Sequence, residues 1–225
     1  MNIRLFDGLD REHLLPLVYL RPVADVFMGG MTFRERWLKL FAKSVTVETV
    51  DYLTEPNDII PDICILASLI PTSEFVDAVQ SLAPNQKLVC EGEVLAYHGG
   101  IASNDSILDS YESISIQKSN FIRIKHNWDL FLMNEHALRF DISLLSKDKV
   151  SATIADTNVQ IGDGAITIGS NVNMDGVSLN TTDGPIYIDE GATIMEGSML
   201  RGPLYVGKNS VIKMGTKVYS NCSIG

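Results

Sequence analysis

The last third of the chain repeats an aliphatic residue at every sixth position without a slip. These positions are Ile188, Ile194, Leu200, Val206, Ile212, Val218 and Ile224. Between them lie small residues and residues that form turns or accept a positive φ, such as Gly191, Pro203 and Asn209. A spacing of six matches neither the period of an α-helix nor the alternation of a single β-strand. The chain therefore has to build a repeating unit of short strands and turns here.

A short strand followed by a turn, repeated three times per coil, satisfies this spacing. Each aliphatic side chain then points into a narrow prism and stacks on its equivalent one coil later. We therefore expect a left-handed parallel β-helix over residues 151–225, because a meander of ordinary hairpins would not hold one phase over so many repeats. The Asn180–Pro185 stretch breaks the phase and is expected to loop outward. Since the repeat is still in phase at Gly225, we also expect the natural protein to continue beyond it.

Residues 1–125 follow a different pattern, in which short β-rich runs alternate with helical segments. The Thr32-Phe33-Arg34-Glu35 segment has the spacing of a capping box and opens an amphipathic helix. This alternation predicts an α/β domain with a mixed, mostly parallel sheet, joined to the β-helix by a linking helix within residues 126–150. The expected strands are Ile3–Phe6, Val45–Val50, Ile63–Ala67, Leu88–Cys90 and Val94–Tyr97, with a second helix from Pro71 to Leu82 and the linking helix from Asn127 to Leu145.

Charge and composition exclude several classes of function. The chain has 18 basic and 28 acidic residues, a net charge of −10, which is the wrong sign for a surface that binds nucleic acid or anionic lipid. Phosphorylated small molecules remain compatible, because a few local Arg or Lys residues can hold one phosphate. The first ten residues are too polar for a signal peptide, so we expect a cytoplasmic protein. Three scattered cysteines predict neither a disulfide framework nor a zinc site.

The order of these elements and several short segments resemble a known family. The segments are Leu5-Phe6-Asp7, Leu14-Leu15-Pro16-Leu17, Arg21-Pro22-Val23-Ala24-Asp25, Thr32-Phe33-Arg34-Glu35-Arg36-Trp37 and Met195-Glu196-Gly197-Ser198-Met199-Leu200-Arg201-Gly202-Pro203. Over essentially its whole length the chain resembles the GlmU-like bifunctional sugar-1-phosphate nucleotidyltransferase/acetyltransferase family, in the branch found in some bacteria and archaea. The resemblance implies a nucleotidyltransferase-like, Rossmann-like first domain, and substrates that are a sugar-1-phosphate and UTP or dTTP.

For the first domain, the resemblance implies a nucleotide site where the chain leaves the first strand. Glycines and basic residues have this role because backbone N–H groups and cations balance the charge of phosphates. The implied nucleotide-binding residues are Phe6, Asp7, Arg11 and Arg21. The chain departs from the family motif at Val23, where the family has Lys, and around Leu66-Ala67-Ser68-Leu69, where it lacks the carboxylate that holds Mg²⁺. Two interpretations stay open: a site rebuilt with Arg21, Arg34 and Asp25, or a domain that binds or supports without catalysis.

For the second domain, the resemblance implies acetyl-CoA and a sugar phosphate held between the β-helices of a homotrimer. Arg201 is the candidate contact to the sugar phosphate, with a solvated arginine at a subunit seam as the alternative. The four histidines, His13, His98, His126 and His136, all precede the β-helix, so the family's general base is missing. We therefore expect this chain alone to lack acetyltransferase activity. Outward Met195, Met199, Tyr205 and Tyr219 are the expected trimer contacts.

Two other classes of function compete with this interpretation. A β-helical carbonic anhydrase would need histidines on the coil faces, and the chain has none there. A non-catalytic trimeric scaffold that binds a nucleotide sugar fits the same architecture and differs from an enzyme only in turnover.

Overall fold

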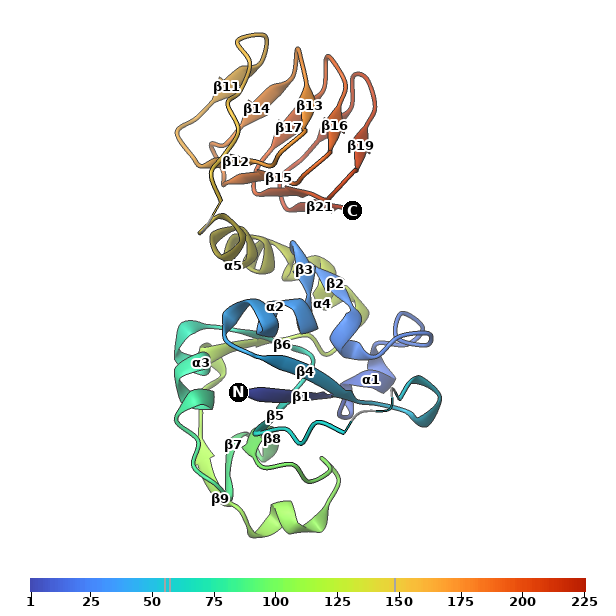
Figure 1. Ribbon diagram of the computed structural model, residues 1–225, viewed down its shortest axis with the longest axis vertical. Helices are drawn as coiled ribbons and strands as arrows, with labels where there is room; N and C mark the ends of the chain where they lie inside the picture. The colour runs from blue at the N-terminus through green and yellow to red at the C-terminus, as the bar shows by residue number, and fades with distance from the viewer. Residues whose placement is uncertain (55, 57, 148) are drawn as a thin grey trace. The chain divides into compact units, whose positions relative to one another are not determined.

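The computed structural model describes residues 1–54, 56, 58–147 and 149–225, so one position of the expected 126–150 linking segment, residue 148, lies outside the described residues. The chain forms two compact units (Figure 1). Residues 1–27 and 32–131 form an α/β unit, and residues 28–31 and 132–225 form a unit that contains the repeats. Within the part of the chain that is described, no helix is long and apolar enough to span a membrane.

The α/β unit is built on a mixed sheet, as expected; the sheet has six strands, one more than the five expected from the sequence. The strands are β1 (Asn2–Phe6), β4 (Ser44–Glu48), β5 (Ile63–Leu66), β7 (Gln86–Cys90), β8 (Glu93–His98) and β9 (Glu112–Ser115), in the order β4-β1-β5-β8-β7-β9. Strand β1 pairs in parallel with β4 and β5, and β7 pairs in parallel with β9. Strand β8 runs antiparallel to β5 and β7. Every residue of β5 is buried, which explains its continuous apolar sequence.

Short helices and strands surround this sheet. Helix α2 (Phe33–Leu40) begins with the predicted capping box, in which Thr32 Oγ1 accepts from the Glu35 N–H and the Glu35 carboxylate accepts from the Thr32 N–H. The Thr72 hydroxyl caps α3 (Ser73–Gln80). The other elements are α1 (Asp10–His13), η1 (Val23–Asp25), β2 (Phe27–Met28), β3 (Met31–Thr32), η2 (Asp51–Leu53), β6 (Leu69–Pro71), η3 (Ser106–Ser110), η4 (Lys118–Asn120), β10 (Phe121–Arg123) and α4 (Asn127–Leu132).

The helix expected from Asn127 to Leu145 is divided at Met133 into α4 and α5 (Asn134–Ser146). Helix α5 buries Leu138 and Ile142 against two stacked tyrosines of the β-helix, Tyr187 and Tyr205, whose ring centroids lie 5.6 Å apart. Tyr205 does point out of the prism, as expected, but this helix covers it. The expectation that Tyr205 belongs to a trimer contact is therefore wrong.

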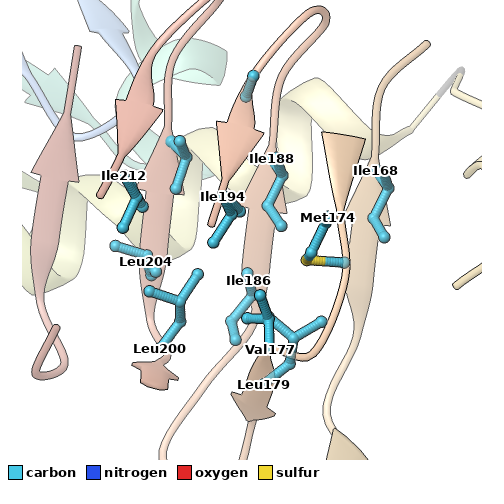
Figure 2. Packing of buried hydrophobic residues seen from close by; sticks show 12 residues of the cluster. Ile168, Met174, Val177, Leu179, Ile186, Ile188, Ile194, Leu200, Leu204 and Ile212 are labelled. Carbon is cyan, nitrogen blue, oxygen red and sulfur yellow. The ribbon is translucent and has the colours of Figure 1, made fainter. Parts of the chain in front are cut away.

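The repeats form a parallel β-helix with three stacked sheets. One contains β11 (Val159–Ile161), β14 (Ser178–Asn180), β17 (Met199–Arg201) and β20 (Lys217–Val218); the next contains β12 (Ile166–Ile168), β15 (Ile186–Ile188), β18 (Leu204–Val206) and β21 (Cys222–Ile224); the third contains β13 (Asn173–Met174), β16 (Thr193–Ile194) and β19 (Val211–Ile212). The aliphatic side chains point inward and stack coil on coil (Figure 2).

The register of the coils also shows where the repeat is interrupted. Leu200 pairs with Val218, eighteen positions further on, as three six-residue units require. Leu179 pairs with Leu200, twenty-one positions further on. The additional residues lie in the 181–185 segment between β14 and β15, which matches the outward loop expected at Asn180–Pro185.

Candidate functional site

The α/β unit contains a cavity of about 580 Å³, the β1 pocket, at one edge of its sheet. It lies where β1, β4 and β5 end, at Phe6, Glu48 and Leu66. Because β4 and β5 lie on opposite sides of β1, this edge is a switch point, where open α/β sheets bind their ligands. Its lining residues are Phe6, Asp7, Gly8, Leu9, Arg11, Glu48, Thr49, Val50, Leu66, Gly92, Glu93, Val94, Ser103, Asn104 and Arg123.

Asp7 and Arg11 form an ion pair in the floor of the β1 pocket, and both are nearly buried. Asp7 Oδ2 accepts from Arg11 Nη1 at 2.8 Å and from the Thr49 hydroxyl at 2.5 Å. Asp7 Oδ1 accepts from the Val23 N–H at 2.9 Å. Arg11 also donates to the carbonyls of Val18 and Arg21. These contacts hold the 18–23 segment against the end of β1 and engage both oxygens of the Asp7 carboxylate.

The structure brings three of the four expected nucleotide-binding residues together in the β1 pocket. Phe6, Asp7 and Arg11 line it, whereas the Arg21 side chain is exposed and is not among the lining residues. Arg21 contributes its backbone carbonyl to Arg11. Arg34 and Asp25, proposed from the sequence as parts of a rebuilt site, form an ion pair with each other at 2.7 Å and do not line the pocket.

Sequence reasoning missed a second arginine–aspartate pair in this site. Arg123 at the end of β10 donates from Nε and Nη2 to the two oxygens of Asp10, at 2.8 and 2.9 Å. Asp10 is 2% exposed and also accepts from the Ser68 hydroxyl. Arg123 Nη1 donates to Glu93, which also pairs with Lys125. Arg123 and Asp10 are 113 positions apart, so no local motif could have predicted this pair.

Among the described residues, the two aspartates at the end of β1 and in α1 are each paired with an arginine. The segment around Ser68 has no carboxylate of its own, and the fold supplies Asp10 beside it. Both Asp10 oxygens accept from Arg123, and both Asp7 oxygens accept from other donors, so Mg²⁺ would have to compete with an arginine at either carboxylate. Among the residues that the structure describes, no three His, Cys, Asp or Glu side chains form a metal-binding group.

A loop after β8 closes one side of the β1 pocket. The Ser103 N–H donates to Glu48 Oε1 at 2.9 Å, and the Ser103 hydroxyl donates to the same oxygen. Arg4 lies 3.9 Å from the other Glu48 oxygen. Glu48 therefore ties the loop to the end of β4, and Ser103 and Asn104 become part of the cavity wall.

On the β-helix, Arg201 lies at the end of β17 and is exposed. Its Nη1 forms an ion pair with Asp183 Oδ2 at 2.7 Å, across to the loop that interrupts the repeat. Arg201 and Lys217 also border a hollow of about 240 Å³ on the β11-β14-β17-β20 face, together with Met199 and Tyr219. This face combines two cations with exposed apolar side chains.

The fold and the β1 pocket define a class of α/β protein with a cavity at the switch point of its sheet and a β-helix after it. Residues 3–150 match the family model described as sugar nucleotidyl transferase, so the chain belongs to the sugar nucleotidyl transferase family. Comparison with curated proteins gives no significant match. The family match covers nearly all of the α/β unit and implies a transferase whose substrates are a nucleotide and a sugar phosphate.

Proposed function

We propose that the α/β unit binds UTP or dTTP in the β1 pocket and transfers its nucleotidyl group to an amino-sugar 1-phosphate, as in the GlmU-like enzymes. The observation that carries this proposal is Arg123, a guanidinium held by a buried aspartate and facing a cavity at the carboxyl ends of parallel strands. The volume of this cavity, about 580 Å³, is within the usual range for small-molecule sites.

The proposed reaction needs charge neutralisation more than acid–base chemistry. An oxygen of the sugar phosphate attacks the α-phosphorus of the nucleotide, and a new P–O bond forms. The bond from this phosphorus to the bridging oxygen breaks, and pyrophosphate leaves with the electron pair. Arg123 is positioned to stabilise the negative charge on the α-phosphate, because Asp10 fixes the plane of its guanidinium. Arg11 acts differently: it positions Asp7 and the 18–23 segment that shape the pocket floor.

A second candidate function is nucleotide-sugar binding without catalysis. One specific observation favours it: Asp7 and Asp10 already accept hydrogen bonds at both oxygens. Mg²⁺ binds poorly to carboxylates that an arginine already holds. The two functions differ in one measurable product, which is pyrophosphate.

Pyrophosphate release from UTP or dTTP with N-acetylglucosamine 1-phosphate, measured with and without Mg²⁺, separates the two functions. We expect release by the wild-type chain and a fall of at least about 100-fold in Arg123→Met, the usual cost of losing one charge-stabilising donor. Arg139→Gln, which removes an exposed ion pair on α5, is the matched control. Saturable nucleotide binding without pyrophosphate release would favour the binding function. Nucleotide binding by Arg21→Ala tests whether Arg21, the expected nucleotide-binding residue that does not line the β1 pocket, contributes to binding.

For the β-helix we propose association into a homotrimer, with a role in acetyl transfer from acetyl-CoA in which Arg201 contacts the sugar phosphate. Exposed Met199 and Tyr219 beside the hollow on the β11-β14-β17-β20 face support association, because burial would remove their apolar surface from water. Light scattering should give three times the chain mass, and Tyr219→Arg should lower it. A monomer at micromolar concentration would refute this proposal.

The acetyl-transfer part of the proposal has its own test. Residues 151–225 contain no histidine, so they can hold a substrate but lack the usual general base. A thiol-release assay with acetyl-CoA and glucosamine 1-phosphate should therefore be negative for this chain. Turnover by the chain would show that another residue accepts the amine proton.

A further inference from the structure

A second cavity of about 320 Å³, the β10 pocket, adjoins the first along one wall. It is lined by Cys90, Glu91, Glu93, Lys118, Phe121, Arg123, Lys125, His126 and Asp129. Three cations gather here, Lys118, Arg123 and Lys125, together with three carboxylates, Glu91, Glu93 and Asp129. Among the described lining residues of the β1 pocket the cations are Arg11 and Arg123, and the contacts of Arg11 are made within the protein. The β10 pocket therefore has the higher concentration of basic side chains.

One carboxylate oxygen already occupies the point where two of these cations meet. Glu93 Oε2 accepts from Arg123 Nη1 and from Lys125 Nζ, the latter at 3.4 Å. The Arg123 side chain is only 12% exposed, whereas the Glu93 side chain is 45% exposed. Since Asp10 holds Arg123 from behind, the guanidinium is fixed and the glutamate is the member free to move. The two cations thus form a prepared site for an anionic oxygen, and an exchangeable side chain fills it.

The remaining lining groups suit a ligand that carries hydroxyl groups as well as a phosphate. Glu91 pairs with Lys118 at 2.7 Å, and both side chains are largely exposed at the pocket. The Glu91 carboxylate can accept hydrogen bonds from the hydroxyl groups of a sugar. Pyrophosphate has no such hydroxyl groups to donate. His126 stacks on Trp128 at 4.4 Å between ring centroids and forms part of the pocket wall. A pocket of this size is at the lower end of the range for small-molecule sites, smaller than the β1 pocket.

The two cavities share Arg123 and Glu93 in their lining. A reaction that joins two phosphorylated substrates needs both phosphates at one point, and the shared wall is such a point. We propose that the β10 pocket binds the sugar 1-phosphate, whose phosphate displaces Glu93 from Arg123 and Lys125. This inference rests on the proposed nucleotidyl transfer and assigns its acceptor substrate to a site. Arg123 then contacts both the acceptor phosphate and the α-phosphate that it attacks.

The test is calorimetric titration with N-acetylglucosamine 1-phosphate, with and without a non-hydrolysable UTP analogue. Lys125→Gln should weaken sugar-phosphate binding about tenfold, the loss expected for one charge-assisted hydrogen bond, and should leave binding of the UTP analogue unchanged. Lys43→Gln, an exposed lysine before β4 and outside the lining of both cavities, is the matched control. Inorganic phosphate should bind more weakly than the sugar phosphate, because it makes no hydroxyl contacts.

Glu93→Gln supplies a readout that a purely structural role would not produce. If the ligand phosphate competes with this carboxylate, removing the charge should tighten sugar-phosphate binding several-fold. Weaker binding in Glu93→Gln would overturn the proposal, as would a Lys125→Gln effect on the UTP analogue alone, which would place the polyphosphate in the β10 pocket. The proposal would also be overturned if the wild-type chain did not bind the sugar phosphate with the UTP analogue present or without it. Pyrophosphate release by the wild-type chain, measured separately, shows whether the proposed function stands in each case.

Discussion

Replacing Asp10 by Asn removes the charge that holds Arg123, and the structure allows the cost to be worked out. Asp10 is 2% exposed and accepts from Arg123 Nε, Arg123 Nη2 and the Ser68 hydroxyl. Breaking one partner out of a buried ion pair costs about 3–5 kcal/mol. Arg123 retains Glu93 and 12% of its side-chain surface in contact with solvent, so we expect the lower end of that range. Asp10→Asn should therefore lower the free energy of unfolding by about 3 kcal/mol.

Urea unfolding followed by tryptophan fluorescence measures this loss of stability in the α/β unit. Trp37 and Trp128 both lie within residues 1–27 and 32–131, so their fluorescence reports on the α/β unit. At a urea m-value of about 2 kcal/mol per M, the midpoint should fall by about 1.5 M. Glu91→Gln, which breaks an exposed ion pair in the same unit, is the control and should not move the midpoint measurably.

A double-mutant cycle shows whether the loss comes from the pair itself. In an Arg123→Met background, Asp10→Asn should lower the free energy of unfolding far less, because the guanidinium charge that Asp10 neutralises is no longer there. Equal costs in the two backgrounds, or a midpoint shift below about 0.5 M in Asp10→Asn alone, would refute the reasoning that Asp10 anchors Arg123.

Four further predictions concern other parts of the chain. Tyr205→Ala should destabilise residues 132–225 by about 3–5 kcal/mol in calorimetry, because a ring buried against α5 is lost, whereas Met214→Ala, at a 66% exposed position, should leave that transition in place. Burial raises the pKa of the Cys64 thiol to about 11, so at mildly alkaline pH thiol reagents should modify the partly exposed Cys222 first; equal rates would contradict this. Because the folded pKa of Cys64 exceeds its ordinary value of 9.0, this thiol stabilises the fold fully below pH 9.0, and the contribution is lost as the pH rises to about 11; Cys64→Ala should flatten the stability curve there. Thr32→Ala removes the capping box of α2 and should cost about 1 kcal/mol in urea unfolding, and an unchanged midpoint would mean that packing alone holds this end of the helix.

Local sequence patterns predicted much of the architecture. The six-residue period predicted the β-helix because each repeat contacts its neighbours in the same way, so the pattern itself encodes the contacts. The capping box predicted where α2 begins because both partners lie within one turn of the helix. The division of the helix at Met133 was not predicted, since apolar residues on both sides of it keep a helical spacing.

The candidate site was predicted only where it depends on one short segment. Phe6 is the last residue of one strand, Asp7 and Arg11 follow it, and the end of that strand could be recognised in the sequence. Arg21 is only ten positions from Arg11, yet the fold uses its carbonyl and exposes its side chain. Tyr205 illustrates the same limit, because whether an outward ring meets a partner subunit or a helix of its own chain depends on where α5 packs.

The sequence by itself determined the elements whose contacts repeat or stay local: the coils, the caps and the apolar strands of the sheet. Only the tertiary structure decided which charged groups meet. Arg123 joins Asp10, and Ser68 joins Asp10, through strands and helices distant along the chain. No period in the sequence indicates such pairs. Which groups meet depends on the strand order and on the free-energy cost of leaving a buried charge unpaired. The same physical reason places the guanidinium of Arg123 in the wall between two cavities, where neither its position in the sequence nor its neighbours indicated a role.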